Sequence, residues 1–273
     1  MIEQSKLLKI TAAFIIVSLL FGFLSFLKIR YQFYLWEILI DLKIVCVIGV
    51  IVNSFRKNEI SFDPSQRRFF SFDWKKNILW FSVPLLAYAL TIGSGLAAGD
   101  MKLNKMENAV TLVLATFFDI PAIYVFSVTS ILIEEIMFRG ILLRSFAQTS
   151  GVYRSVFVVS FLWTLFMISD IIGGELFDAT ESAVLTLYFL SVGILVTSLS
   201  LWRGNVWFGY SLRIGLITLT PIILTSRINE SDSFFSSGSL LFIAEGVVVS
   251  VVLILIAAIV LINFRKNSSI SIH

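Results

Sequence analysis

Long apolar segments separated by short polar loops dominate the hydrophobic pattern of this chain. A membrane-spanning helix needs about 20 consecutive, mainly apolar residues, and the chain divides into about eight segments of this kind. No alternation of strand type stands out between them. The pattern predicts an all-α, polytopic membrane helix bundle of about eight transmembrane helices. The predicted spans are 8–27, 33–54, 77–98, 109–144, 153–172, 182–201, 205–225 and 239–263.

The fourth of these segments differs from the others in its length. The region 108–148 is too long for one simple span, and it contains Pro121. Proline removes a backbone donor and breaks or kinks a helix. We therefore predict a kinked or two-part fourth span that ends at Arg144, with Asp119 capping its second half.

Composition supports the membrane prediction. The chain of 273 residues is 58% hydrophobic and only 14% charged, with a mean hydropathy of +0.93, whereas soluble domains are about 45–50% apolar and about 25% charged. We expect one integral membrane domain over residues 1–273, with membrane lipid as its surroundings. The small net charge of +3 bears on orientation and indicates no nucleic-acid partner.

The basic residues of the loops indicate the orientation. Most of them fall on the side of the N-terminus in the eight-span topology, above all in the loop 55–76, while the opposite side has few. Cytoplasmic loops carry the excess of Lys and Arg. The chain is therefore predicted to have both termini in the cytoplasm, and we interpret it as an integral protein of a bacterial cytoplasmic (inner) membrane.

Cysteine and histidine are nearly absent. Cys46 is the only cysteine and His273 the only histidine, so neither an intramolecular disulfide nor a cysteine metal cluster is expected. Zinc sites need three or four good ligands, and only two neighbouring glutamates are evident. We expect no metal and no cofactor.

Three charged residues stand at the end of an apolar run. Glu134, Glu135 and Arg139 follow Ser130-Ile131-Leu132-Ile133, and one charge inside a membrane helix costs about 2.5–3.5 kcal/mol on insertion scales. Glu135 and Arg139 are four apart and share a helix face, with Glu134 about 100° away. A solvated helix end at the interface would explain Arg139 alone, but it explains two consecutive glutamates less well. This cluster is the candidate site.

The sequence Glu134-Glu135-Ile136-Met137-Phe138-Arg139-Gly140 resembles the first motif of the CPBP family, the CAAX-protease and bacteriocin-processing (type II CAAX protease/Abi) intramembrane endopeptidases. The resemblance extends from about residue 115 to 225, within a predicted core of 109–225. It implies cleavage of peptide bonds in membrane-associated proteins, either prenylated or carrying a leader peptide. It also implies that Glu134 is the general base that activates a water, supported by Glu135 and Arg139. Burial favours the neutral form of a carboxyl group, which makes the ionised form a better base.

Two later helices of that family carry a Phe-x-x-x-His motif and a His-x-x-x-Asn or His-x-x-x-Asp motif. At these positions this chain has Trp163 and Met167, then Arg213 and Ile217. Methionine neither donates a strong hydrogen bond nor shuttles a proton, and arginine donates without deprotonating. His273 follows the last predicted span and is not expected to substitute.

Arg213 is an isolated charge within the seventh span. It lies about 12 Å into that span at 1.5 Å per residue, and buried charges are normally paired. Snorkelling to the interface is the alternative. We predict that Arg213 reaches Glu134 or Glu135 and turns a water-activating site into an ion-pair network.

Three functions remain open from the sequence. The first is an intramembrane endopeptidase acting on a membrane-associated protein or peptide substrate. The second is a catalytically inactive relative with a binding, immunity or regulatory role, and the third is a transporter that uses intramembrane charges such as Glu37 and Asp41. Convincing inverted repeats are lacking, which disfavours the third. Glu245 is either a residue of a substrate path or, as we favour, a partner in a structural hydrogen bond.

Overall fold

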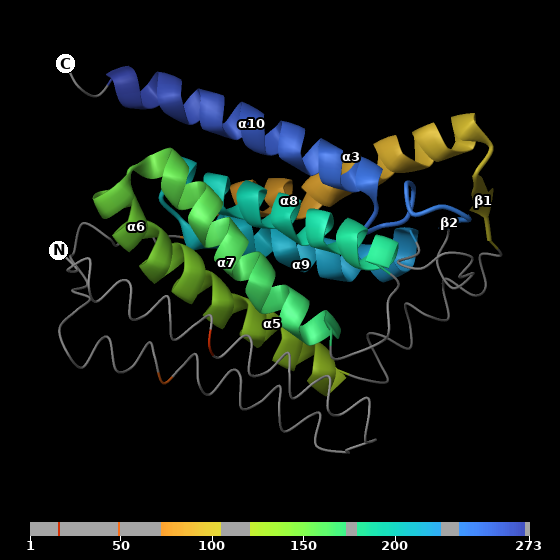
Figure 1. Ribbon diagram of the computed structural model, residues 1–273, viewed down its shortest axis with the longest axis horizontal. Helices are drawn as coiled ribbons and strands as arrows, with labels where there is room; N and C mark the ends of the chain where they lie inside the picture. The colour runs from red at the N-terminus through yellow and green to blue at the C-terminus, as the bar shows by residue number, and fades with distance from the viewer. Residues whose placement is uncertain are drawn as a thin grey trace.

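The computed structural model describes residues 16, 49, 72–104, 121–172, 179–224 and 235–270. Within these ranges the chain is mostly helical (Figure 1). Ile16 and Gly49 are each helical. The remainder of the first two predicted spans lies outside the described residues, as do Asp119, Glu37, Asp41, Cys46 and His273.

The described helices pack side by side, with α5 and α7 running obliquely to α8 and α9 (Figure 1). They are α3 (Trp74–Ala98), α5 (Pro121–Glu135), the π-helical segment η3 (Ile136–Leu142), α6 (Leu143–Ser150), α7 (Val152–Ile172), α8 (Ala179–Arg203), α9 (Val206–Ile223) and α10 (Val247–Ile270). Two short strands, β1 (Met101–Leu103) and β2 (Phe235–Ser237), pair antiparallel with Met101 opposite Ser237. This ribbon was not predicted, because three residues are too few to show strand alternation.

Most predicted spans correspond to observed helices within a few residues. The largest difference is α10, which begins at Val247 instead of residue 239 because residues 239–246 form turns. α5 begins at Pro121, the first described residue of this region, so the break in the fourth span stays a prediction. At the other end the prediction is wrong, because the helical chain continues past Arg144 to Ser150.

Among the described residues, three helices are long and apolar enough to cross a membrane: α3, residues Ala179–Trp202 of α8, and residues Val247–Arg265 of α10. The molecule is therefore consistent with an integral membrane protein of helical type. The number of eight spans and their orientation stay predictions.

Local sequence explains where several helices begin and end. Asp73 caps α3 by accepting a hydrogen bond from the backbone nitrogen of Lys76 at 3.3 Å. Gly99 ends the same helix with φ at 76°, a left-handed conformation that favours glycine. Asn205 caps α9 through the backbone nitrogen of Trp207 at 2.8 Å.

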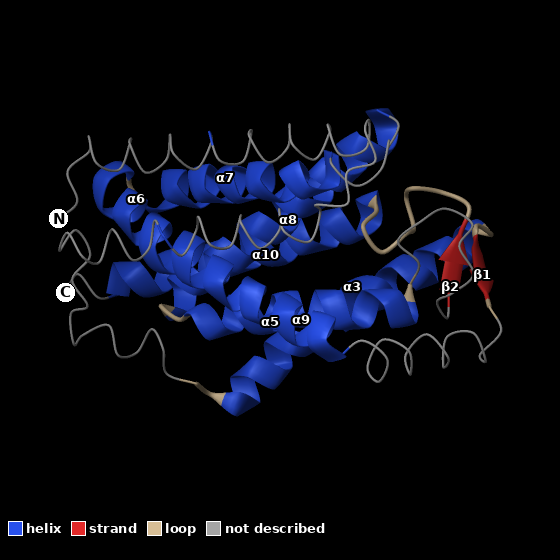
Figure 2. Ribbon diagram, turned by 90° about the horizontal axis from the view of Figure 1, so that it is seen from below, coloured by secondary structure: helices blue, strands red, loops and turns tan. Residues whose placement is uncertain are grey.

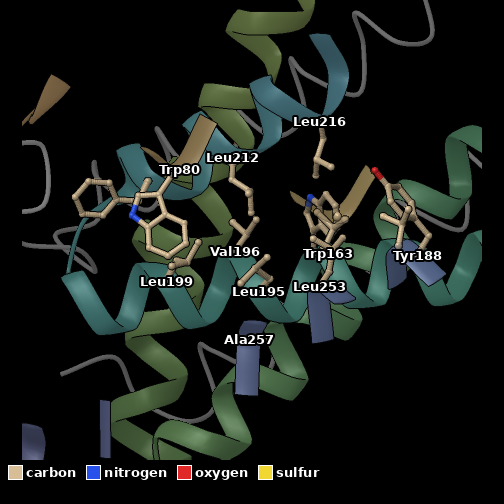
Figure 3. Packing of buried hydrophobic residues seen from close by; sticks show 14 of the residues in the cluster. Trp80, Trp163, Tyr188, Leu195, Val196, Leu199, Leu212, Leu216, Leu253 and Ala257 are labelled. Carbon is tan, nitrogen blue, oxygen red and sulfur yellow. The ribbon is translucent and has the colours of Figure 1, made fainter. Parts of the chain in front are cut away.

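α8 is the central helix of the described bundle. It contacts α7, α9 and α10. In its apolar stretch of 18 residues, 61% is buried inside the bundle, whereas the corresponding stretches of α3 and α10 are each 28% buried. The two outer helices therefore present their apolar faces to the surroundings. Figure 3 shows how Leu195, Val196 and Leu199 of α8 pack toward Leu212 of α9 and toward α10.

The two ends of the bundle differ in what they contain. The β1–β2 ribbon lies at one end, and the α6–α7 turn and the C-terminal end of α10 lie at the other (Figure 2). β1 and β2 belong to two loops that the predicted topology places on the same, non-cytoplasmic side. Their pairing is compatible with that topology, and it leaves the number of spans and the direction of the protein in the membrane as predictions.

α3 and α9 approach each other closely at two points. Ser211 donates a hydrogen bond to Asn77 across this contact at 2.8 Å. A β-carbon added at Gly215 would overlap the backbone carbonyl oxygen of Phe81. Small residues permit such close contact between membrane helices, so Gly215 sets the α3–α9 spacing.

Replacing Gly215 with alanine should therefore lower the melting temperature of the detergent-solubilised protein. Overpacking a rigid contact costs about 1–3 kcal/mol. Gly93→Ala is the matched control, because a β-carbon there meets nothing within 4 Å and Ala is the better helix former. Equal melting temperatures for the two variants would contradict the close contact.

Candidate functional site

The helix that carries both glutamates changes its hydrogen-bonding pattern within the motif. α5 ends at Glu135, and η3 continues as a wider π-helical turn through Met137, Phe138 and Arg139. The backbone N–H of Leu143 donates to the carbonyl of Phe138, five residues back. Such π-helical turns are rare and frequent at functional sites. The side chains of Met137, Phe138 and Arg139 in this turn are all buried, so the π-helical turn directs them into the bundle.

Arg213 of α9 binds both glutamates. Its Nη2 donates to Glu134 Oε2 at 2.8 Å, and its Nη1 donates to Glu135 Oε1 at 3.0 Å. The Glu135 Oε1 atom also accepts from Arg139 Nη1 at 3.1 Å. The expected pairing of Arg213 with the glutamates is therefore present, and snorkelling is not. Glu135 and Arg139 also share a face, as their spacing predicted.

Burial makes these contacts strong. The side chains of Glu135 and Arg139 are 0% exposed, that of Arg213 is 5% exposed and that of Glu134 is 13% exposed. Ion pairs gain little at a surface but much more in a low-dielectric interior, where they offset part of the desolvation cost. The formal charges of two carboxylates and two guanidinium groups cancel. We call these four side chains the charge network.

Trp163 of α7 contacts three members of the charge network. Its indole Nε1 donates to Glu134 Oε2 at 3.3 Å. The guanidinium carbons of Arg139 and Arg213 each lie 4.8 Å from its ring centre. Cation–π contacts of this kind are worth about 2 kcal/mol when desolvated. Trp163 therefore offsets part of the cost of removing the two guanidinium groups from water.

Some polar atoms of the charge network have no hydrogen-bond partner among the described residues. They are Glu135 Oε2 and the Nε and Nη2 atoms of Arg139. Glu135 Oε2 faces Gly209 of α9, where an added β-carbon would lie 2.9 Å from it. Glycine at this position lets α9 approach the carboxylate, and any larger residue would displace it.

A pocket of about 300 Å³ lies beside the charge network. All four positions that differ from the family motifs line it: Trp163, Met167, Arg213 and Ile217. The remaining lining residues come from α8, α9 and the turn before α10: Tyr188, Phe189, Val192, Leu216, Thr220 and Glu245. Glu134 and Glu135 do not line it, so Arg213 stands between the pocket and the carboxylates.

The structure thus brings most of the predicted site residues together. Glu134, Glu135, Arg139, Trp163 and Arg213 form one contacting group, whereas the other two motif positions border only the pocket. The pocket residues Tyr188 and Thr220 were missed by the sequence analysis. The available signal for Tyr188 was its place as the one tyrosine in the predicted span 182–201.

Within the described part of the chain, no three His, Cys, Asp or Glu side chains gather as a metal site would require. The two glutamates that do lie together already bind guanidinium groups. A divalent cation there would have to displace Arg213 from both carboxylates.

A family model described as Rce1-like, type II CAAX prenyl endopeptidase Rce1-like, matches residues 115–216. This match agrees with the predicted resemblance to the CPBP family and covers η3, α7, α8 and Arg213. No curated protein matches the chain. The matched family suggests an intramembrane protease of the CAAX type, which acts on membrane-associated peptide substrates.

Arg213→Ala should destabilise the protein by about 3–5 kcal/mol, because removing one partner of a buried ion pair leaves uncompensated charge. The melting temperature in detergent measures this loss. Arg265→Ala is the control, since Arg265 is exposed near the end of α10 and a surface substitution changes little.

A double variant separates the contribution of charge to stability from the contribution of side-chain packing. Arg213→Met with Glu135→Gln should lose less stability than the sum of the two single variants, because the residues in one ion-pair network couple. Strict additivity of the two losses would contradict the charge network.

Proposed function

We propose that this chain is a membrane-embedded binding protein built on the scaffold of a CAAX-type intramembrane protease. It binds a membrane-associated protein or peptide and does not cleave it. The observation that carries the proposal is the double hydrogen bond from Arg213 to the two motif glutamates. This contact occupies one oxygen of each carboxylate, which reduces the capacity of the pair to accept a proton from a water.

General-base catalysis requires a free lone pair within reach of the water. Glu134 Oε2 accepts from both Arg213 and Trp163, and Glu135 Oε1 accepts from both arginines. Glu135 Oε2 is buried against Gly209. Two of the four carboxylate oxygens are thus bonded to arginine or indole donors, so a catalytic water at either would have to compete with charge-assisted hydrogen bonds.

The replaced motif positions support the same proposal. Met167 cannot hold a water or stabilise an oxyanion as a histidine would. Arg213 can donate hydrogen bonds but cannot accept a proton, and its donors already serve the glutamates. Loss of acid–base assistance alone typically lowers a rate by about 10²–10⁴.

The pocket supports a binding role. It is mostly apolar, it opens beside the half-exposed Ile217, and it lies where the resembled family has its motif histidines. A concave, largely apolar site with a few convergent polar groups is the usual form of a ligand site.

An active protease is the second candidate, and one observation favours it. Glu134 is the most exposed member of the charge network at 13%. Its Oε1 atom accepts only a long hydrogen bond, 3.4 Å from Ser130 Oγ. A water could therefore reach this oxygen, provided that Arg213 keeps the carboxylate in place without taking both of its oxygens.

A cleavage assay distinguishes the two candidates. The purified protein in lipid nanodiscs would be incubated with a library of membrane and prenylated peptides, and mass spectrometry would detect products. Four proteins are compared: wild type, Glu134→Gln, a Met167→His, Arg213→His double variant, and the same double variant with Glu134→Gln added. Melting temperatures establish that each variant is folded.

We expect the wild type and Glu134→Gln to give the same background while both retain bound peptide. Glu134-dependent cleavage in the double-histidine variant would show that the library contains a substrate and that Arg213 prevents the reaction. Glu134-dependent cleavage by the wild type would contradict the proposal and establish the protease.

A further inference from the structure

We infer that the pocket beside the charge network binds an uncharged single-chain lipid through one oxygen of its head group, a hydroxyl or a carbonyl. The group that binds this oxygen is the hydroxyl of Tyr188. The inference goes beyond the proposed function, and it holds whether or not the protein cleaves peptides. It rests on the hydrogen-bonding state of the polar groups in the pocket and on the place where the pocket opens.

Tyr188 of α8 has a buried hydroxyl that the protein leaves unused. The residue is only 5% exposed, and it lines the pocket. Its backbone carbonyl accepts a hydrogen bond from Ser191, but its hydroxyl makes no hydrogen bond within the described part of the chain. A buried hydroxyl without a partner costs free energy, and buried tyrosines usually have one. Tyr188 therefore has a donor available for a ligand.

The hydroxyl of Tyr188 lies among the other residues of the pocket. Figure 3 shows its oxygen on the side of the ring toward Leu216, which lines the same pocket. The phenol also interacts electrostatically with Arg213 and Glu245, and both of these line the pocket as well. The available donor is thus surrounded by lining residues from α9 and from the turn before α10.

The other N–H and O–H groups of uncharged side chains in the pocket are already engaged. The indole N–H of Trp163 donates to Glu134. The hydroxyl of Thr220 donates to the backbone carbonyl of Leu216 and is also hydrogen-bonded to Tyr88. Among the uncharged lining residues that the structure describes, Tyr188 is therefore the one that offers a ligand a hydroxyl without first losing a contact.

The charged residues of the pocket exclude a charged ligand. Arg213 is bound to both motif glutamates and covered by the Trp163 ring, and Glu245 already interacts with another group of the protein. A charged head group would therefore be buried without a counter-charge of its own, which is very costly. An uncharged oxygen needs only the one hydrogen bond that Tyr188 can donate.

The rest of the lining suits a hydrocarbon chain. Phe189 packs edge to face with Tyr188 and with Trp163, at distances of 5.5 and 6.0 Å between ring centres. Aliphatic side chains of α8 and α9 complete the wall. A volume of about 300 Å³ is at the small end for ligand sites, so the pocket holds a small head group and a short length of chain.

The pocket opens toward lipid. Ile217 at its opening is 45% exposed and follows Val206, the first residue of α9, by eleven positions, which is about 16 Å along the helix. α9 packs beside α3 and α8, which are both long and apolar enough to cross a membrane. An extended peptide entering at this depth would leave backbone polar groups unsatisfied in the hydrocarbon region, whereas a lipid chain has none.

Photolabelling tests the inference. The protein is held in phosphatidylglycerol nanodiscs and labelled with a tritiated diazirine derivative of 1-dodecanol. The competitors are 1-dodecanol, methyl dodecanoate and dodecane, compared at equal mole fractions in the bilayer, and the capped peptide N-acetyl-trileucine amide.

Two variants change the pocket, and each has a matched control outside it. Tyr188→Phe removes only the hydroxyl, and Ile217→Trp fills the opening. The controls are Tyr153→Phe on α7 and Ile259→Trp on α10, because these residues are 46% and 59% exposed and do not line the pocket. Melting temperatures establish folding. Tyr188→Phe should keep the wild-type melting temperature, since its hydroxyl bonds nothing in the free protein.

We expect saturable labelling of the wild type that 1-dodecanol or methyl dodecanoate displaces at lower mole fractions than dodecane does. The stronger of the two oxygenated competitors assigns the head group as a hydroxyl or a carbonyl. Tyr188→Phe should weaken that competitor about threefold to tenfold, as loss of one uncharged hydrogen bond does, and should leave dodecane unchanged. Ile217→Trp should abolish saturable labelling, and both controls should behave like the wild type.

Three results would overturn the inference. They are the absence of saturable labelling, equal competition by dodecane and the oxygenated lipids in the wild type, and equal affinities in the wild type and Tyr188→Phe. Displacement by the capped peptide but by neither oxygenated lipid would also overturn it and assign the pocket to a peptide. The cleavage assay described above depends on none of these results, so failure of this inference is distinguishable from failure of the proposed function.

Discussion

Four buried charges at the centre of the molecule must cancel one another, and much of the arrangement around them follows from that need. Glu134 and Glu135 come from α5, Arg139 from η3 and Arg213 from α9. Without Arg213 the group would hold two carboxylates and one guanidinium, which is a net charge in a low-dielectric interior. Several kcal/mol oppose such a charge even after relaxation. The position of α9 relative to the motif helix is therefore fixed by electrostatics as well as by apolar packing.

Trp163 links this electrostatic requirement to the packing of α7. Its indole ring makes a cation–π contact with each of the two arginines, and its N–H donates to Glu134. The indole is therefore a common neighbour of three charged groups. The same ring packs against Phe189 of α8. A phenylalanine at this position would retain the ring contacts but would lose the donor to Glu134. The tryptophan therefore suits a site in which the carboxylate is held in place.

The sequence predicted the parts of this molecule that depend on local composition. Helices such as α3 and α8 follow from apolar runs of spanning length, and the two glutamates and Arg139 were identified by their cost in lipid. The pairing of Arg213 was also predictable, because an isolated charge inside an apolar span requires a partner. Glu134 and Glu135 could be named as its partners because few other acidic residues occur in the predicted spans.

Other features depend on contacts that a linear pattern does not encode. The π-helical turn of η3 leaves the hydropathy of 136–142 unchanged, so nothing in the sequence distinguishes it from an α-helix. The β1–β2 ribbon joins residues more than a hundred positions apart over a length too short to show alternation. The pocket is formed by three helices and a turn, and its acidic residue, Glu245, lies outside the span to which the sequence analysis assigned it.

The replaced motif positions connect the charge network with the pocket. Arg213 directs its guanidinium toward the glutamates while it also lines the pocket, and Met167 and Ile217 line the same space without strong hydrogen-bonding groups. Arg213 thus binds the carboxylates of Glu134 and Glu135 on one side and borders the mainly apolar pocket on the other. Because Arg213 and Trp163 belong to both, a ligand in the pocket would contact the residues that hold the glutamates. Arg213 and Trp163 are therefore the two side chains that the pocket and the carboxylates share.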